Sequence, residues 1–507
     1  MVTTIVWFRR DLRVEDNLAL SQAALRGAVL PVYFPDWERG NEWAPGRAAT
    51  WWLERSLRSL TEQLRGLGAA LLTVPGDPVV QLPVLAARYQ ADEVVWNRLY
   101  DPFGRRLDTE VVRELARIGV RTHAFPGALL FEPEDYLARS GKPYAQFTAF
   151  WKACLAGPPP AEPVTGPSRL IAAALPVSPV DEDSAGLLTP VPDGGEGRGR
   201  EIEQTREQEV GGRLDAARVY RSRVLPVPTV RSGLGWQPGE IGAWQRLESF
   251  LAESLIGYER GRDLPGEEAV SRLSPHLHFG EISPRQVWTA VQQAATDDRA
   301  KTQATAFLRQ LGWREFAYYL LWHFPYLPHE PFRPEFRGFP WAEDRVALSA
   351  WQRGETGFSL VDAGMRQLAA EGWMHNRVRM VVASFLTKDL LIPWQEGAKW
   401  FWDNLIDADL ANNTLGWQWT AGCGPDAVPY FRIYNPELQR VRFDREGVYV
   451  RRWLGAEAFL GSGPGGGLHE RGVAPIVDHA TARVRALAAF RGLRRPVSAC
   501  EQRRHSV

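Results

Sequence analysis

The side chains best suited to ligand chemistry lie together in one stretch, IDADLANNTLGWQW. Two carboxylates, Asp407 and Asp409, precede an amide at Asn413 and indoles at Trp417 and Trp419. Carboxylates can accept hydrogen bonds from ribose hydroxyls, a ring N–H or an arginine, and an amide can donate to or accept from a ring nitrogen whose protonation changes. The acid spacing would also fit a metal-binding loop, but the stretch holds neither a histidine nor a third acid. We therefore predict no metal centre here.

Two amphipathic segments carry an unusual mixture of side chains on one helical face. They read QLGWREFAYYLLWHF at 310–324 and GWMHNRVRMVVASFL at 372–386. Aromatic and arginine side chains together suit a stacked, negatively charged ligand such as an extruded nucleotide. An ordinary core with surface ion pairs is the alternative, and the pattern alone does not separate the two. The residues concerned are Trp313, Arg314, Asn376, Arg377 and Met380.

A third segment, YERGRDLPGEEAVSRLSPHLHFGEIS, places Ser271 and Ser274 on either side of Arg272 just before an apolar stretch. Hydroxyls and free backbone N–H groups near a helix start can hold phosphate oxygens. Serine is also common at ordinary helix starts, where it caps the first turn. The segment is a candidate phosphate site, and the serines alone do not distinguish it from an ordinary helix start.

The composition of the chain narrows the class of protein. Its 507 residues exceed one ordinary domain, and 60 basic against 60 acidic residues give no net charge. That balance argues against a generally basic surface but leaves room for a local basic groove. Three cysteines, Cys154, Cys423 and Cys500, form neither a disulfide framework nor a zinc motif. Because no signal peptide and no apolar run of roughly 18 residues is present, we expect a cytoplasmic protein without a membrane span.

Residues 1–135 alternate short apolar runs with amphipathic segments. Five runs, TTIVWF, AVLPVYF, AALLTVP, DEVVWN and VRTHAF, have the composition of strands. Strands that alternate with helices predict an α/β domain with a doubly wound parallel sheet. The first run is followed by FRRDLRVEDN instead of the GxGxxG fingerprint, so we expect no dinucleotide in this domain.

The rest of the chain divides into a connector and a helical domain. We interpret residues 136–235 as an interdomain connector with a disordered insert at 180–215, where glycine and dense charge replace aromatic side chains. Apolar residues recur at three and four over 236–490, which predicts a large all-α domain. Within it, ISPRQVWTAVQQA predicts a helix that begins with a capping box. Residues 491–507 form a short basic tail.

Six motifs in chain order together resemble the photolyase/cryptochrome family. They are VWFRRDLRVEDNLAL, RLSPHLHFGEISPRQVW, LGWREF, GWMHNRVRM, DADLANNTLGWQW and PYFRIYNP, and the resemblance covers nearly all of the chain outside 180–215. The version WMHNRVRM resembles bacterial enzymes that repair cyclobutane pyrimidine dimers, of class I or plant-cryptochrome-like type. The resemblance implies FAD in the helical domain and UV-damaged DNA as the partner of a monomeric protein.

The resemblance assigns FAD contacts to three parts of the sequence. Tyr258 and the segment that begins at Val270 would contact the phosphates, although the family commonly has threonine where Val270 stands. The carboxylates of DADLANN would bind the flavin ring and ribose, with Arg379 paired to Asp407 and Asn413 facing the ring nitrogen that changes protonation. The full implied set is Tyr258, Val270, Ser271, Arg272, Leu273, Ser274, Arg379, Asp407, Ala408, Asp409 and Asn413.

The resemblance also assigns an electron-transfer chain and a lesion pocket. Trp417, Trp394 and Trp341 match the family's chain from flavin to surface, and together with Asn413 they form the implied catalytic set. Trp313 and Trp419 match the pair that flanks the flipped dimer. Many dimer photolyases have glutamate where Gln310 stands, and an amide can still bond base edges. The implied lesion contacts are Gln310, Asn376 and Met380, and the implied DNA contacts are Arg262, Arg314, Arg377 and Gln439.

The implied activity is a carbon–carbon lyase reaction driven by blue light. Excited reduced FAD passes an electron to the dimer, the cyclobutane ring splits, and the electron returns, so that the protein supplies binding and orientation. A signalling cryptochrome and a (6-4) photolyase are the alternatives. The short tail and the asparagine at 413 argue against a plant-type cryptochrome.

The family also implies a second, antenna chromophore in the α/β domain. The run RLYDPFGRR places Phe103 and Gly104 where some members use glutamate to hold methenyltetrahydrofolate. The run WWLERSL, in contrast, resembles folate-using relatives. We favour methenyltetrahydrofolate over deazaflavin or flavin mononucleotide and leave open that no antenna is bound.

Overall fold

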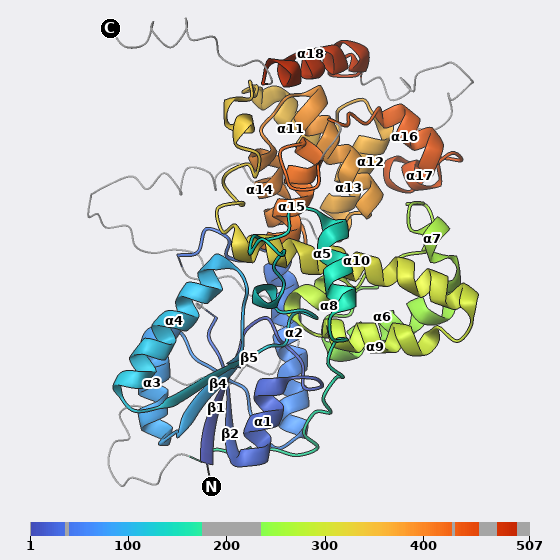
Figure 1. Cartoon of the computed structure of the whole chain (residues 1–507). Helices are drawn as coiled ribbons and strands as arrows, with labels where there is room; N and C mark the ends of the chain where they lie inside the picture. Colours follow the sequence, from blue (N-terminus) through green and yellow to red (C-terminus); the bar gives the residue numbers. More distant parts are fainter. Residues whose placement is uncertain (1, 36–39, 175–234, 428–430, 456–473, 494–507) are drawn as a thin grey trace, which may run out of the picture.

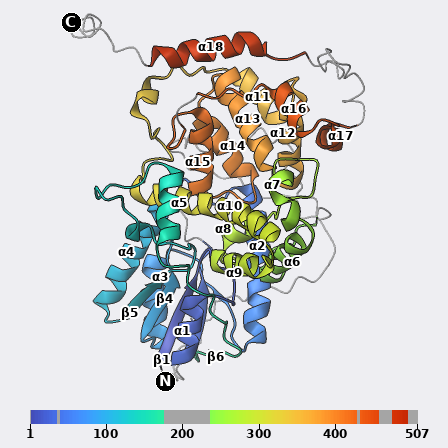
Figure 2. The ribbon, with the colours of Figure 1, turned by 45° about the vertical axis from the view of Figure 1, so that its right-hand side comes forward.

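The computed structural model describes residues 2–35, 40–174, 235–427, 431–455 and 474–493. An N-terminal α/β domain and a larger helical domain lie against each other, with the long helix α10 (Asp298–His323) running between them (Figures 1 and 2). The insert predicted at 180–215 and nearly all of the basic tail predicted at 491–507 lie outside the described residues.

The N-terminal domain is built on one parallel sheet. The spatial order is β3-β2-β1-β4-β5, with β6 added beside β2, and every recorded pairing is parallel. The central strands are buried, as their Ile- and Val-rich runs predict. The doubly wound domain is thus confirmed. The strands are β1 (Val2–Phe8), β2 (Gly27–Tyr33), β3 (Leu72–Thr73), β4 (Glu93–Asn97), β5 (Arg121–Phe125) and β6 (Ile171–Ala172), and the helices are α1 (Leu18–Arg26), α2 (Arg47–Gly66), α3 (Pro78–Tyr89) and α4 (Pro102–Arg117).

The first part of the predicted connector is ordered. It contains α5 (Phe147–Ala156) and the short strand β6, neither of which was predicted, because the segment between them begins with GPPPAEP and was assigned as connector as a whole. The strand β6 returns the chain to the sheet beside β2, whereas α5 packs against α10 of the helical domain.

The second domain is helical, as predicted. The capping box is present at Ser283, whose hydroxyl accepts from the Gln286 backbone N–H while the Gln286 side chain accepts from the Ser283 N–H. The remaining helices are α6 (Glu240–Glu253), α7 (Tyr258–Gly261), α8 (Ser274–Phe279), α9 (Pro284–Ala294), α11 (Arg345–Arg353), α12 (Ser359–Glu371), α13 (Asn376–Ser384), α14 (Trp394–Asn404), α15 (Leu410–Ala421), α16 (Pro436–Phe443), α17 (Val448–Leu454) and α18 (His479–Gly492).

The loop after β1, which carries FRRDLRVEDN, joins the two domains. The buried Arg13 guanidinium donates to the carbonyls of Gly280 and Gly127 at 2.9 and 3.1 Å. Asp16 pairs with Arg285 through two hydrogen bonds of 2.8 and 3.0 Å, and both side chains are buried. The Glu240 carboxylate accepts hydrogen bonds from the two backbone N–H groups that follow Arg13 in this loop. The motif therefore occupies the position of a dinucleotide loop but serves as an interdomain contact.

Glu315 makes a second interdomain contact from the middle of α10. Its carboxylate accepts from the backbone N–H groups of Leu130 and Phe131 at 2.7 and 3.3 Å. Burial raises the pKa of Glu315 to about 7, against the opposing effect of Arg314. A carboxyl group whose pKa is higher in the folded than in the unfolded state stabilises the fold at low pH, and that contribution is lost as the pH rises through the folded value.

We therefore expect the free energy of unfolding to fall between pH 4.5 and 7 by about 3 kcal/mol through this one group. Glu315→Gln should flatten that part of the pH profile, because an amide does not titrate. Urea unfolding at pH 5, 6, 7 and 8 measures the slope, and Glu110→Gln on the exposed side of α4 is the control. An unchanged slope in Glu315→Gln would assign the titration to another group.

Candidate functional site

Helix α15 begins at Asp409, whose carboxylate is held from three sides. One oxygen accepts from the backbone and side-chain N–H groups of Asn412 at 2.8 and 2.6 Å, which makes Asp409 the N-cap. The other oxygen accepts from the Tyr318 hydroxyl and faces His278 Nδ1 at 3.5 Å. Burial opposes ionisation, but the hydrogen bonds from His278 and Tyr318 hold the pKa of Asp409 well below its usual range. Asp409 is therefore a fixed anion.

The polar and aromatic side chains of α15 are separated onto different faces. Asn413 and Trp417 are four residues apart and follow Asp409 at the same spacing, so the three line one side of the helix. The Asn413 amide donates to the Ala398 carbonyl at 3.0 Å, which leaves its own carbonyl oxygen as the group for a ligand. Trp417 is buried, whereas Trp419, which lies two residues on, is half-buried on another side. Helix α15 thus presents Asn413 and Trp417 on one side and Trp419 on another.

The predicted pair between Arg379 and Asp407 is present. Arg379 Nη2 lies 3.1 and 2.8 Å from the two Asp407 oxygens, and its Nε donates to the Met374 carbonyl at 2.7 Å. Ala408, between the two acids, is buried. Because the half-buried Arg379 guanidinium lies beside the buried Asp407 carboxylate, this pair can offer both a donor and an acceptor to a polar ring.

The candidate phosphate segment has the backbone of an anion-binding nest. Arg272 adopts a positive φ of 52°, which is uncommon for a residue with a side chain, and Leu273 follows in the right-handed helical region. Successive residues of opposite hand point neighbouring N–H groups into one concavity, where an anion is favoured. Ser274 Oγ accepts from Trp373 Nε1 at 3.2 Å, which leaves the Ser274 hydroxyl hydrogen for an oxygen ligand. The half-buried Ser271 hydroxyl lies next to the same backbone.

The Arg272 side chain itself is engaged elsewhere. Its guanidinium lies 4.7 Å from the Trp373 ring centre and forms ion pairs with Glu268 and Glu371 at 3.3 and 3.7 Å. The positive charge at this position therefore holds the loop in place, which leaves the backbone as the part of Arg272 available to a ligand. Val270 packs against the core of the α/β domain, in agreement with a backbone-only contact at that position.

Tyr258, the first residue of α7, is placed mainly by packing. Its ring contacts Phe250 and Phe307 edge-on at centroid distances of 5.6 and 5.2 Å, and burial raises the pKa of its hydroxyl to about 12. Tyr258 thus enters the site as a neutral hydroxyl that can donate to a phosphate oxygen.

The three indoles of the predicted chain run from buried to half-exposed positions. Trp417 and Trp394 are each 2% exposed, whereas Trp341 is half-buried. Trp417 packs so closely on α14 that a Cβ added to Gly397 would lie 2.1 Å from its ring. Trp417 also contacts the fully buried Trp351 at a centroid distance of 6.2 Å, a neighbour that sequence reasoning missed because nothing in its spacing separates it from core.

Residues predicted to meet DNA come together where α7, α10 and α13 meet. Gln310 Oε1 accepts from Arg262 at 3.1 Å, and Arg377 pairs with Asp263 at 2.7 Å. Arg377 also lies 3.8 Å from the Met380 sulfur. These half-buried cations and amides form a polar surface, referred to below as the Arg262–Arg377 cluster.

The other predicted lesion and DNA residues lie on separate elements. Asn376 is exposed at the first position of α13, and Gln439 is half-buried on α16. Trp313 is half-buried on α10, three residues after Gln310, and Trp419 on α15 lies 5.8 Å from the Arg432 guanidinium. Each of these four side chains is therefore at least partly exposed on the helix that carries it.

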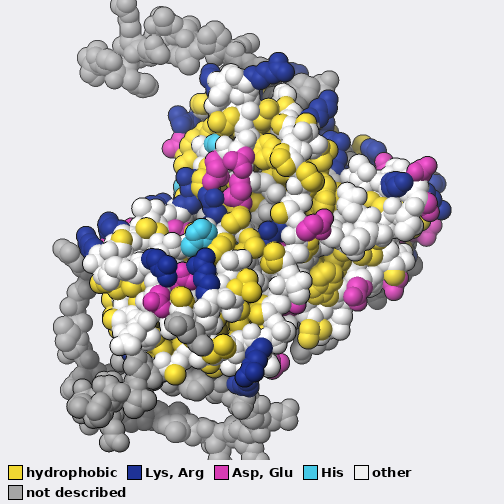
Figure 3. Space-filling model, turned by 60° about the horizontal axis from the view of Figure 1, so that its bottom comes forward, with side chains coloured by type: hydrophobic (Ala, Val, Ile, Leu, Met, Phe, Trp, Pro, Cys, Tyr) yellow, Lys and Arg dark blue, Asp and Glu magenta, His cyan; other side chains and the backbone are white. Residues whose placement is uncertain are grey.

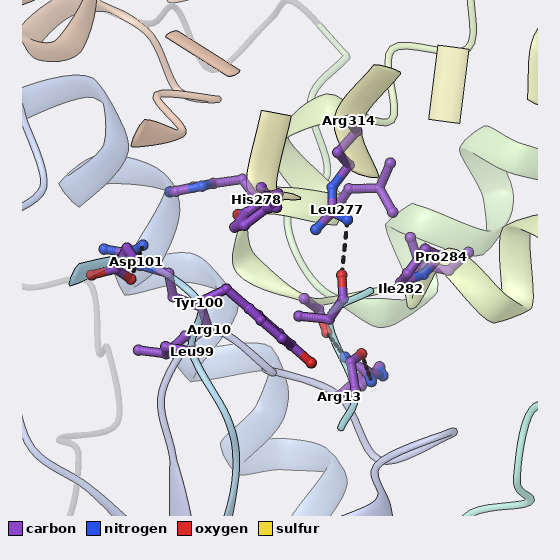
Figure 4. A pocket seen from close by; sticks show the side chains of 14 residues that line it. Arg10, Arg13, Leu99, Tyr100, Asp101, Leu277, His278, Ile282, Pro284 and Arg314 are labelled. Atoms are coloured by element: carbon purple, nitrogen blue, oxygen red, sulfur yellow. Dashed lines mark hydrogen bonds and ion pairs between the residues drawn. The ribbon is translucent and has the colours of Figure 1, made fainter. Parts of the chain in front are cut away.

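Arg314 differs from the other predicted DNA contacts, because it points toward the α/β domain. Figure 4 shows Arg314 in an interdomain pocket, and its guanidinium donates to the Ala128 carbonyl at 2.8 Å and to Glu315 at 3.2 Å and lies 4.8 Å from the Tyr318 ring centre. It lines this pocket together with Arg10, Arg13, Tyr100, Asp101 and His278. A direct contact between Arg314 and DNA stays a prediction that this geometry does not favour.

Two further partners of the site were missed by the sequence analysis. Tyr318 and His278 hold Asp409 but stand on α10 and α8, far from it in sequence. Tyr318 lies eight residues after Gln310, which is about 80° further round α10, so the position of Gln310 does not mark it. No pattern around His278 marks it.

The molecular surface agrees with the balanced composition. On the face shown in Figure 3, acidic and basic side chains are interspersed rather than gathered into one basic coat. Among the described residues, no group of three or more His, Cys, Asp or Glu side chains could hold a metal ion. None of the described helices is long and apolar enough to cross a membrane.

Comparison with known proteins assigns this architecture to a family. Residues 307–460 match the FAD binding domain of DNA photolyase, and residues 4–167 match the DNA photolyase domain. The deoxyribodipyrimidine photo-lyase of Agrobacterium fabrum is 41% identical over 509 residues, covering 97% of this chain and 98% of the relative. The chain belongs to the DNA photolyase/cryptochrome family.

Solved structures and further relatives include both branches of the family. A bacterial class III photolyase from Agrobacterium tumefaciens has a TM-score of 0.81 and 39% identity, covering 97% of this chain and 98% of that one. A cryptochrome from Synechocystis has a TM-score of 0.78 and 26% identity, covering 96% and 99%. Cryptochrome-2 of Arabidopsis thaliana is 36% identical over 89% of this chain and 70% of its own length. Class III is a type that the sequence analysis did not name.

Proposed function

We propose that this protein is a deoxyribodipyrimidine photo-lyase that repairs cyclobutane pyrimidine dimers in DNA with blue light. The observation that carries the proposal is α15, which directs Asn413 and Trp417 to one side and Trp419 to another. One rigid helix can thus contact an electron-transferring cofactor on one side and a stacked base on another. The high similarity to a photo-lyase over the whole chain supports the same assignment.

FAD fits the donor set on the first side. The nest at Arg272 and Leu273, with the Ser274 hydroxyl, offers donors to phosphate oxygens. The Asp407–Arg379 pair and the Asn413 carbonyl offer polar contacts to a ring. Reduced FAD, when bound, supplies under blue light the electron that splits the dimer. The protein's part is to bind, orient and exclude water.

The dimer would reach the site by leaving the DNA helix. Photolyases are among the enzymes that extrude their target nucleotide, which costs least at damaged pairs. Trp313 and Trp419 supply half-buried indole faces for stacking, and the Arg262–Arg377 cluster supplies charge for the phosphates on either side. We expect the enzyme to act as a monomer in the cytoplasm.

Light-dependent repair of defined oligonucleotides by the pure, reduced protein tests the proposal. Repair of a cyclobutane dimer, without repair of a (6-4) lesion or in darkness, is the expected result. The cryptochromes among the relatives make signalling without repair the second candidate, and bound FAD with no repair of either lesion would favour it. Repair of the (6-4) lesion alone would reassign the substrate.

The purified protein should contain one FAD that is released by denaturation. Ser274→Ala together with Asp407→Ala should lower the affinity for FAD by about tenfold or more, because each removes a polar contact worth roughly 0.5–1.5 kcal/mol. Fluorescence titration of the FAD-free protein measures this, and Ser249→Ala on the exposed side of α6 is the control. A folded protein that binds no FAD would end the assignment.

Gln310→Glu tests how the lesion side is arranged. A carboxylate at this position should form an ion pair with Arg262, which now donates to the amide, and should withdraw that guanidinium from phosphate. We expect the slope of log Kd against log salt for undamaged DNA to fall by about 1. Gln292→Glu, exposed on α9, controls for the added charge. Equal slopes in the two variants would separate Arg262 from DNA binding.

The antenna chromophore is a further part of this proposal. Gly104 is fixed by packing, since a Cβ there would lie 2.6 Å from Leu99 Cβ, so a glutamate cannot stand at this position without rearrangement. Trp52 and Ser56 of WWLERSL are engaged by Glu281, which leaves Trp51, stacked on Arg55, as the aromatic available to a pterin ring. A photolyase structure from Sulfolobus tokodaii contains two FAD molecules. Absorbance of the extracted chromophores identifies what this protein holds.

A further inference from the structure

Helix α5 lies beside α10 in both orientations of the ribbon (Figures 1 and 2) and places an aromatic ring against Trp313. The rings of Phe147 and Trp313 have centroids 3.8 Å apart and planes inclined by 10°. Phe147 is fully buried, whereas Trp313 is half-buried. One face of the Trp313 indole is therefore covered by protein, and a base can stack only on the opposite face.

A second ring of α5 holds the backbone next to Trp313. Trp151, one turn after Phe147, lies nearly parallel to it, with an inclination of 13° and a centroid distance of 6.1 Å. A Cβ added to Gly312 would lie 2.7 Å from the Trp151 ring, so the helix can approach this closely only at glycine. Both the backbone before Trp313 and the ring of Trp313 are thus fixed by α5.

The start of α5 also contacts the loop that follows α15. Asp426 in that loop adopts a positive φ of 55° and interacts with the Phe147 backbone N–H and with Arg309. Arg309 in turn lies 5.3 Å from the Phe147 ring centre. The first turn of α5 thus contacts α10, which carries Trp313, and the loop that follows the helix of Trp419.

We propose that Phe147 is a positioning residue for lesion recognition, which fixes the plane of Trp313 before the dimer arrives. The inference rests on the proposed function. A preset indole loses less conformational freedom on binding than a free one, so the gain belongs to the stacked lesion and not to phosphate contacts. Phe147 is not among the residues that we assign to FAD, and its aromatic ring contacts are with Trp151, Trp313 and Phe316.

Phe147→Leu removes the ring but keeps an apolar side chain of similar size. The ratio of affinities for dimer-containing and undamaged DNA, measured at one salt concentration, should fall by about three- to tenfold, the range that one ring contact can supply. Phe150→Leu is the matched control, because Phe150 is equally buried on the same helix but contacts Phe316 and Tyr319. It should lower the melting temperature comparably and leave the ratio unchanged.

A double-mutant cycle separates positioning from general loosening. If Phe147 acts through Trp313, then Phe147→Leu should have no further effect on the ratio in the Trp313→Ala background. Phe147→Met repeats the test if the leucine variant does not fold. Equal ratios in wild type and Phe147→Leu, or equal losses in both backgrounds, would overturn the inference while leaving photo-lyase activity intact. A wild-type protein that does not discriminate at all would overturn the proposed function itself.

Discussion

Trp417→Phe should slow the blue-light reduction of bound oxidised FAD by about tenfold or more, the equivalent of at least ~1.4 kcal/mol in barrier height. Phenylalanine fills much of the space against Gly397 and Phe401 but is far harder to oxidise than an indole. Trp417 is the member of the predicted chain that shares a helix face with Asn413, so its loss breaks the route at its inner end. Flavin absorbance under continuous illumination with an external reductant measures the rate.

Repair by chemically reduced Trp417→Phe should remain close to that of wild type, because we propose that the tryptophan chain supplies electrons to the flavin and not to the lesion. Trp322→Phe is the control, since Trp322 lies between Arg98 and Arg105 at the domain boundary, outside the proposed route. Equal photoreduction in wild type and Trp417→Phe would remove the electron-transfer assignment, and FAD binding would stand unaffected.

Trp419→Ala should reduce the preference for damaged over undamaged DNA by roughly tenfold or more. Stacking of a base on an aromatic ring contributes about 1–3 kcal/mol, and ~1.4 kcal/mol corresponds to one decade in Kd. Trp419 is half-buried, so an indole face is present without any rearrangement of α15. The affinity for undamaged DNA should barely change, since we propose that phosphate contacts from Arg262 and Arg377 provide it. The informative quantity is the ratio at one fixed salt concentration.

Trp51→Ala on α2 provides the comparison for loss of a half-buried indole far from the lesion side. If Trp419→Ala and Trp51→Ala keep the same ratio as wild type, the lesion pocket does not include Trp419. That result would favour the alternative hypothesis that this protein is a signalling cryptochrome, because signalling without repair requires no stacking on a lesion.

Local pattern was enough to predict the parallel sheet, the helical domain and the capping box, because each depends on periodicity or on neighbours three or four residues apart. The pairing of Arg379 with Asp407 came from family resemblance and is present in the structure. What escaped prediction depends on partners distant in sequence. The N-cap role of Asp409 is visible locally, but its Tyr318 and His278 partners come from other helices.

Arg314 illustrates the limit of positional analogy. In the sequence it is next to Trp313, which predicts a basic residue on a ligand-binding face. In the structure its guanidinium donates instead to the Ala128 carbonyl, in a distant part of the chain. The short strand β6 and the stacking of Phe147 on Trp313 depend in the same way on segments that only the fold brings together. A periodicity argument contains no information about such contacts.

The buried contacts of the loop after β1 bear on how the molecule melts. Asp16, Arg13 and Glu240 make buried hydrogen bonds across the domain boundary, and unfolding of either domain breaks them, at a cost of about 1.5–3 kcal/mol for each bond to a charged group. Domains coupled by such a penalty do not unfold independently. Heating should therefore give a single cooperative transition, and neither half should be a self-sufficient fragment when produced without the other.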